Sequence, residues 1–194
     1  MKKTIIICVL IVSIVFSFAA CSGKNDNEQS SELPTVEASD ACSEEMIYKL
    51  NDDGKSYTLV SFGKCTCENI VIADTYNGMA VTSIGDSAFI RCNTVKSITI
   101  PSSVTEIWHR AFLNCTNLES VNIPSSVKNI GFYVFSGCRS LKTVTIPASV
   151  EYVGGDLFNG CKDITVNCET GSKPVAWESN WSSGVSVNWG YTAE

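Results

Sequence analysis

The feature that most constrains this 194-residue chain is a 23-residue repeat that runs four times through its centre. The period carries phenylalanines at Phe89, Phe112, Phe135 and Phe158, and cysteines at Cys92, Cys115, Cys138 and Cys161. A unit this short cannot enclose a hydrophobic core alone, so each copy must bury its apolar edge against the next one. The period therefore predicts a stacked solenoid without an enclosed catalytic pocket, a scaffold typical of binding proteins.

Each repeat is expected to contribute one short strand. In the clearest copy, Leu118, Val121 and Ile123 follow the Leu-x-x-Leu-x-Leu spacing that places a parallel strand on the inner wall of a leucine-rich repeat. Pro124 ends this strand because it has no backbone N–H to donate to the hydrogen-bond ladder between strands. Gly131 is expected to allow a tight corner, although one copy has tryptophan at this position. We expect about five such coils, built mainly of short parallel strands joined by turns or short helical segments.

A recurring motif links the repeats to a known family. The string Ile-Pro-Ser-Ser-Val-x-x-Ile, followed by Ala-Phe-x-x-Cys and a hydrophobic strand, runs from Ile100 to Ile123. It resembles the BspA-like leucine-rich repeats of bacterial surface proteins, and the resemblance extends from about Ile70 to the C-terminus. It implies a surface-exposed, non-catalytic protein that in some relatives attaches cells to host matrix proteins or to other bacteria. No binding residues carry over, because the family does not share one ligand.

The N-terminus has the layout of an export signal. Lys2 and Lys3 precede an apolar run, and small residues stand just before Cys21. Residues 1–20 thus resemble a bacterial lipoprotein signal, in which the Cys21 thiol receives a diacylglycerol; an ordinary secretory signal is the alternative. Residues 21–45 are acidic and too poor in apolar residues to fold, which predicts a disordered tether. The protein is therefore expected at the bacterial cell surface, anchored to a membrane through Cys21.

The two ends of the repeat array, residues 70–163, are expected to be capped. Residues 46–69 are predicted to form an N-terminal capping hairpin, because Asp-Gly at positions 53–54 between alternating runs is a strong turn signal. Residues 164–194 are predicted to form a C-terminal capping module, since an open solenoid end exposes apolar edge. Its aromatic residues are Trp177, Trp181, Trp189 and Tyr191. The alternative is that these aromatics form a carbohydrate-binding platform.

The sequence contains no set of residues that would make an active site, and it calls for neither a metal nor a cofactor. His109 is the only histidine, and its position in the coil predicts an exposed turn. No nucleophile elbow and no phosphate-binding glycine loop is present, so an enzyme is not expected. The net charge of −6 includes no concentration of basic residues, which disfavours a nucleic-acid partner.

Apart from Cys8 in the predicted signal and Cys21, the cysteines fall into two groups. Those of the repeat occupy a core position, where cysteine behaves as a small hydrophobe, and we expect free thiols there. Cys42, Cys65, Cys67 and Cys168 lie outside the repeat and allow three disulfide pairings in an oxidising exterior, among which the sequence does not choose.

The outward positions of the strands form the candidate binding face, because stacking aligns each position with its copies. The face comprises Lys96, Ser97, Thr99, Glu119, Ser120, Asn122, Lys142, Thr143 and Thr145. Its charges alternate in sign along one line, which indicates either register control or contact with a partner. Since the face is small, we expect weak binding to a protein on host matrix or on another cell, made useful by many copies. A passive structural envelope protein is the alternative.

Overall fold

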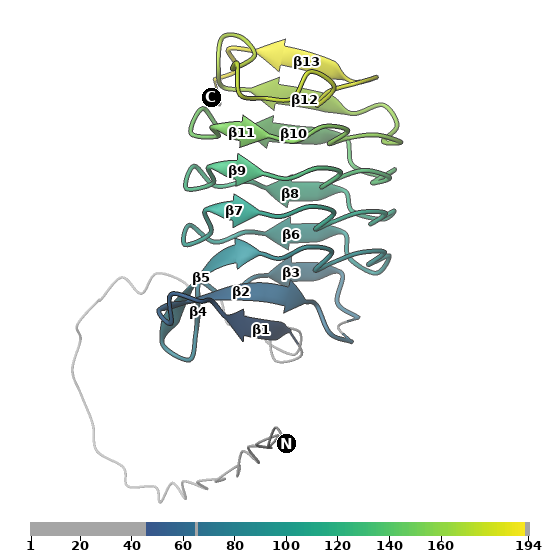
Figure 1. The fold of residues 1–194 in the computed structure, drawn as a ribbon. Helices are drawn as coiled ribbons and strands as arrows, with labels where there is room; N and C mark the ends of the chain where they lie inside the picture. The colour runs from purple at the N-terminus through teal and green to yellow at the C-terminus, as the bar shows by residue number, and fades with distance from the viewer. Residues whose placement is uncertain (1–45, 65, 193–194) are drawn as a thin grey trace, which may run out of the picture. The chain divides into compact units, whose positions relative to one another are not determined.

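The computed structural model describes residues 46–64 and 66–192, which wind into a solenoid of short strands and turns (Figure 1). These residues contain no helix, so turns alone make the far side of each coil. In particular, none of them forms a helix long and apolar enough to cross a membrane. The predicted signal in residues 1–20, the lipidation site Cys21 and the tether in residues 21–45 lie outside the described part of the chain.

The strands form two walls of the solenoid. The first wall is a seven-stranded sheet in the order β1-β2-β5-β7-β9-β11, with β4 beside β5. Its strands are β1 (Ile47–Leu50), β2 (Ser56–Ser61), β4 (Thr75–Tyr76), β5 (Met79–Ile84), β7 (Glu106–Ile107), β9 (Asn129–Ile130) and β11 (Tyr152–Val153). All of its pairings are parallel except β1 with β2 and β4 with β5.

The second wall consists of two three-stranded parallel sheets, β3-β6-β8 and β10-β12-β13, which follow one another along the stack (Figure 1). Its strands are β3 (Asn69–Val71), β6 (Ser97–Thr99), β8 (Ser120–Asn122), β10 (Thr143–Ile146), β12 (Thr165–Cys168) and β13 (Ser186–Trp189). Each regular coil thus passes once through each wall and contributes two strands, one more than the single strand expected from the repeat spacing.

The period appears in the core as columns of identical side chains. Phe89, Phe112, Phe135 and Phe158 are buried and stack face to face, with ring centroids 5.2, 5.4 and 5.8 Å apart. Phe62 extends this phenylalanine column by one ring at the N-terminal end, 5.8 Å from Phe89. Each ring is thereby shielded on both faces by its copies, which accounts for the strict spacing in the sequence.

The predicted N-terminal hairpin is present, and it also begins the solenoid. β1 and β2 pair antiparallel, and Gly54 in the turn between them has a φ of +64°. β2 also pairs in parallel with β5, so the first coil begins at β2 and not at Ile70. The extra residues of the first coil form a second hairpin, β4–β5, turning at Asn77 and Gly78 with φ of +51° and +76°. Asn-Gly is the sequence signal for this two-residue turn.

Glycine is required at the corner positions Gly131 and Gly154 because neighbouring coils approach closely there. The expected reason was different, namely that glycine would allow a tight corner. A Cβ on Gly154 would lie 2.6 Å from the carbonyl carbon of Gly131, and neither residue has a positive φ. The left-handed positions lie elsewhere, two in each coil. The first set is Ser87, Arg110, Tyr133 and Asp156, and the second is Arg91, Asn114, Gly137 and Gly160. Each set keeps the 23-residue spacing, so the same turn geometry is repeated whatever the side chain.

The C-terminal aromatics divide into buried and exposed residues. Trp177 and Trp181 are 2% and 1% exposed, and Trp181 packs edge-on against Phe158 at the end of the phenylalanine column. The indole N–H of Trp177 donates to the carbonyl of Val150 at 3.3 Å. These two residues therefore cap the core and cannot offer a ring face to a sugar, whereas Trp189 and Tyr191 are each 37% exposed.

The cysteines of the repeat are free, as predicted, and Cys168 is also free. Each of three thiols donates to a phenylalanine carbonyl in the preceding coil: Cys115 to Phe89 at 2.9 Å, Cys138 to Phe112 at 3.2 Å and Cys161 to Phe135 at 3.1 Å. Burial raises the pKa of Cys115 to about 12. Burial also raises the pKa values of Cys138 and Cys161, so these three thiols are neutral and poorly nucleophilic. Cys67 is disulfide-bonded.

Candidate functional site

The strands of the second wall direct the predicted face outward. Their central residues point into the core, with Ile98 2% exposed and Val144 1% exposed. The flanking residues therefore alternate to the outer surface. Ser97 lies opposite Ser120 and Thr99 opposite Asn122, in the register that the repeat predicts.

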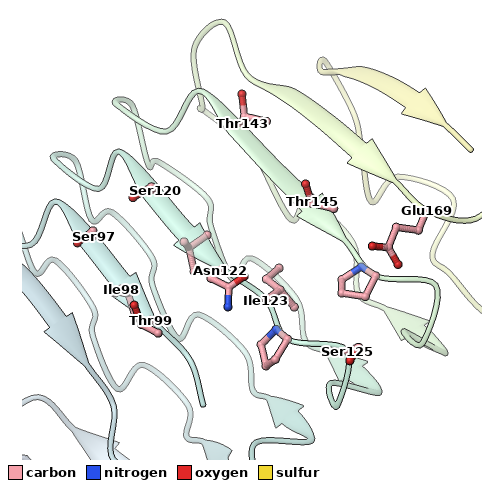
Figure 2. A pocket seen from close by; sticks show the side chains of 13 residues that line it. Ser97, Ile98, Thr99, Ser120, Asn122, Ile123, Ser125, Thr143, Thr145 and Glu169 are labelled. Carbon is pink, nitrogen blue, oxygen red and sulfur yellow. The ribbon is translucent and has the colours of Figure 1, made fainter. Parts of the chain in front are cut away.

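A groove of about 520 Å³ lies along this surface (Figure 2). The six predicted polar residues that line it are Ser97, Thr99, Ser120, Asn122, Thr143 and Thr145. Glu169, Ser125 and the strand-ending prolines Pro124 and Pro147 complete its rim. The structure thus brings the hydroxyl and amide residues of the candidate face together. It leaves the three charged residues, Lys96, Glu119 and Lys142, outside the groove.

Most of the polar side chains in the groove have no protein partner. Ser97 donates to the Asn69 carbonyl oxygen Oδ1 at 2.6 Å. Within the described part of the chain, no side-chain hydrogen bond involves Thr99, Ser120, Asn122, Thr143 or Thr145. Hydroxyl and amide groups both donate and accept, so these five residues offer free hydrogen-bonding groups of both kinds to a ligand.

The groove lies over a break in the second wall that the regular sequence does not reveal. β8 and β10 are neighbours along the stack, but they belong to different sheets and are not joined by a ladder. At the break Val121 is partly exposed and forms part of the groove lining, whereas its equivalents Ile98 and Val144 are buried. The surface is therefore hollowed here and not flat, and its floor includes an apolar side chain.

The predicted alternating charges form only one ion pair. Lys96 contacts Glu68 at 2.7 Å, and the hydrogen bond and charge of Glu68 raise the pKa of Lys96, with a smaller contribution from Glu119. Among the residues that the structure describes, neither Glu119 nor Lys142 has an opposite charge within 4.0 Å. The expected ladder of Lys96, Glu119 and Lys142 is therefore incomplete. Sequence spacing missed Glu68 because the hairpin in the first coil displaces it from the 23-residue register.

His109 is exposed, as its position in the coil predicts. Its Nδ1 accepts a hydrogen bond from the backbone N–H of Phe132 at 2.9 Å, so the ring serves a structural contact between neighbouring coils. Over residues 46–64 and 66–192, no group of three or more His, Cys, Asp or Glu side chains is arranged to hold a metal ion.

Comparison with known proteins identifies the repeat. The family model of the BspA type leucine rich repeat region, which describes six copies of the repeat, matches residues 57–173. The matched region begins within β2, ahead of Ile70, where the resemblance was expected to begin. Among curated proteins none is significantly similar to the chain.

Three solved structures share the fold. A leucine-rich repeat protein from Bacteroides capillosus is 29% identical, with a TM-score of 0.58 over 64% of this chain and 94% of that one. One from Bacteroides ovatus is 34% identical, with a TM-score of 0.56 over 64% of this chain and 36% of that one. A leucine rich cell surface protein from Faecalibacterium prausnitzii is 26% identical, with a TM-score of 0.51 over 72% of this chain and 46% of that one.

The chain therefore spans less than half the length of two of these proteins. The matched region covers more than half of the chain itself and runs from β2 to beyond β12. The chain belongs to the BspA-type leucine-rich repeat family.

Proposed function

We propose that this chain is a non-catalytic protein-binding module that acts at a bacterial cell surface. The observation that carries the proposal is the groove on the second wall, where five hydroxyl and amide side chains have no protein partner. A surface of this kind can pair with the backbone and polar side chains of another protein. Relatives of the same repeat family include a leucine rich cell surface protein, which supports a surface location.

The anchor in this proposal is the Cys21 thiol. Acylation there, after removal of residues 1–20, would hold the folded part on a membrane, and residues 21–45 would act as the tether. Treating intact cells with an external protease tests the location. We expect the protease to release the folded part from the surface. We expect Cys21→Ser to release the protein from the membrane without proteolysis.

The partner is proposed to be a protein on host matrix or on another cell, bound weakly by each copy. A hydrogen bond to the partner replaces one to water, so each contributes only about 0.5–1.5 kcal/mol to the free energy of binding. A standard interface buries about 800 Å² per partner, which a groove of this size does not provide. Binding would therefore become useful through many copies displayed side by side.

Binding of the full chain to cells and matrix proteins, measured both as a monomer and as a dense array, tests the proposal. We expect saturable binding by the array. Asn122→Lys, which blocks the groove, should abolish it. Asn159→Lys is the matched control, because Asn159 is exposed on a turn away from the groove.

Circular dichroism would establish that both variants are folded. The proposal would fail if neither format bound saturably, or if Asn122→Lys and Asn159→Lys bound equally well.

A further inference from the structure

Trp108 breaks the repeat at a position where the fold does not require a side chain. The equivalent residues in the other coils are Gly85, Gly131 and Gly154. All four make the same backbone hydrogen bond to the preceding coil, with N–H to carbonyl distances of 2.7, 2.9, 2.8 and 2.8 Å in chain order. The Trp108 side chain is 44% exposed, so it is not part of the core. Glycine would therefore satisfy the fold here, and the indole must have another use.

The indole lies at a small hollow on the first wall, away from the groove described above. This hollow has a volume of about 290 Å³. Besides Trp108, its lining includes Asp86, Glu106, His109, Asn129 and Tyr152. Gly131, in the next coil, also lines the hollow, and a Cβ there would lie 2.7 Å from the backbone nitrogen of His109. The tryptophan thus forms one side of the hollow, and close packing of the coils requires glycine at the adjacent position.

Two aromatic side chains at this hollow donate their only polar hydrogen to a carboxylate. The indole N–H of Trp108 donates to Glu106 Oε2 at 3.0 Å, and the hydroxyl of Tyr152 donates to Glu178 Oε1 at 3.3 Å. Glu106 is held in turn by the Asn129 amide, at 3.4 Å from its Oε1. These bonds orient the rings before any ligand arrives. Each carboxylate also adds negative charge beside a ring whose face is already negative.

Within the described part of the chain, the negative charge of Glu106 at the hollow is not neutralised by an ion pair. Among the described residues, no basic group lies within 4.0 Å of Glu106 or Glu178. Arg110 pairs with Asp86, which also lines the hollow, at 3.0 Å, and Lys128 pairs with Glu151 at 3.6 Å. The site therefore combines an oriented indole, a phenol and an uncompensated carboxylate.

We propose that this hollow, the Trp108 site, receives an arginine side chain of a partner protein. A guanidinium group is planar and weakly hydrated, so it can stack on the indole face while its N–H groups donate to the Glu106 carboxylate. An ammonium group lacks the flat face, and a neutral sugar gains nothing from the carboxylate charge. The site lies on a different wall from the groove and does not depend on the function proposed for it.

Nuclear magnetic resonance of the full-length ¹⁵N-labelled protein tests this proposal with N-acetylarginine amide as the probe. The Trp108 indole signal is the one, among four tryptophans, that disappears in Trp108→Gly. We expect the probe to shift this signal in a saturable way. N-acetylcitrulline amide, which has nearly the same shape without the charge, should not shift it.

Two variants separate the contributions of stacking and charge. Trp108→Gly restores the glycine of the other coils, and we expect it to weaken binding of the arginine probe about fivefold or more, measured by calorimetry. Glu106→Gln keeps an oxygen for the indole N–H but removes the charge, and we expect about tenfold weaker binding. Glu119→Gln is the matched control, since it removes an exposed carboxylate from the second wall and should leave binding unchanged.

The proposal is overturned if arginine and citrulline probes shift the signal equally, or if neither does. It is also overturned if tetramethylammonium or a methyl glycoside binds more tightly than the arginine probe. Equal loss of affinity in Glu106→Gln and Glu119→Gln would contradict it too, because it would show a general charge effect and not a site.

Discussion

Replacing Phe135 tests whether stacked coils hold the fold together. Its ring is fully buried and lies between Phe112 and Phe158, with centroid distances of 5.4 and 5.8 Å and interplanar angles of 5° and 10°. Phe→Ala in a core typically costs about 3–5 kcal/mol, and the loss of two ring partners places Phe135→Ala at the upper end of that range. This is comparable with the whole stability of many small domains, which is about 5–15 kcal/mol.

A graded series makes the test specific for stacking. Phe135→Leu keeps most of the apolar volume but removes both ring pairs, each of which contributes about 0.5–1.5 kcal/mol, so a loss of about 1–3 kcal/mol is expected. The exposed Tyr133→Ala should change stability by no more than about 0.5 kcal/mol. Urea denaturation followed by circular dichroism measures all three. The reasoning is refuted if Phe135→Leu equals wild type, or if Phe135→Ala costs no more than Tyr133→Ala.

Three further predictions concern the turns and the thiols. Gly154→Ala places a Cβ 2.6 Å from the backbone of Gly131, so thermal denaturation should show a free energy of unfolding lower by about 1–3 kcal/mol. Gly171→Ala is the control, because a Cβ there meets no atom within 4 Å and should leave the free energy of unfolding almost unchanged. In Gly78→Ala the added Cβ meets no atom within 4 Å, but alanine must adopt a φ of +76°. Hydrogen exchange should therefore show that the β4–β5 hairpin alone is less stable, by about 1 kcal/mol. Burial raises the pKa of Cys115 from 9.0 to about 12, and it shifts the pKa values of Cys161 and Cys168 in the same direction. Because these thiols ionise first in the unfolded chain, they should leave the free energy of unfolding unchanged just below pH 9 and lower it between pH 9 and pH 12. Constant stability over that window, in denaturation at several pH values, would contradict their burial.

The regular part of the fold could be predicted from the sequence because each coil repeats the same packing problem. The spacing of Phe89 and its copies determines the core column, and the alternation around Ile98 and Val121 determines which side chains face outward. Both arguments need only the local pattern and the requirement that coils stack. For the same reason the six hydroxyl and amide residues of the candidate face could be expected to lie together, and they line one groove.

The irregular part could not be predicted in this way. β2 joins the first coil although its spacing is interrupted by the β4–β5 hairpin, and the same interruption concealed Glu68 as the partner of Lys96. The break between β8 and β10 leaves no trace in residue type, since Val121 and Val144 are identical but differ in burial.

Trp108 was recognisable as an exception to the repeat, but its use was not. The hydrogen bond to Glu106 and the hollow beside Gly131 depend on how neighbouring coils align their side chains. Departures from a repeat that the core does not explain are therefore the positions at which function should be sought in this chain.

The most direct test of the central claim is whether the rings of Phe112 and Phe135 are in contact in solution. Selective labelling of phenylalanine and measurement of nuclear Overhauser effects between ring protons would decide it. The stacked solenoid predicts contacts between rings 23 residues apart in sequence, in the order Phe89, Phe112, Phe135 and Phe158. An absence of these contacts, with phenylalanine signals broadened by a soluble paramagnetic probe, would contradict it.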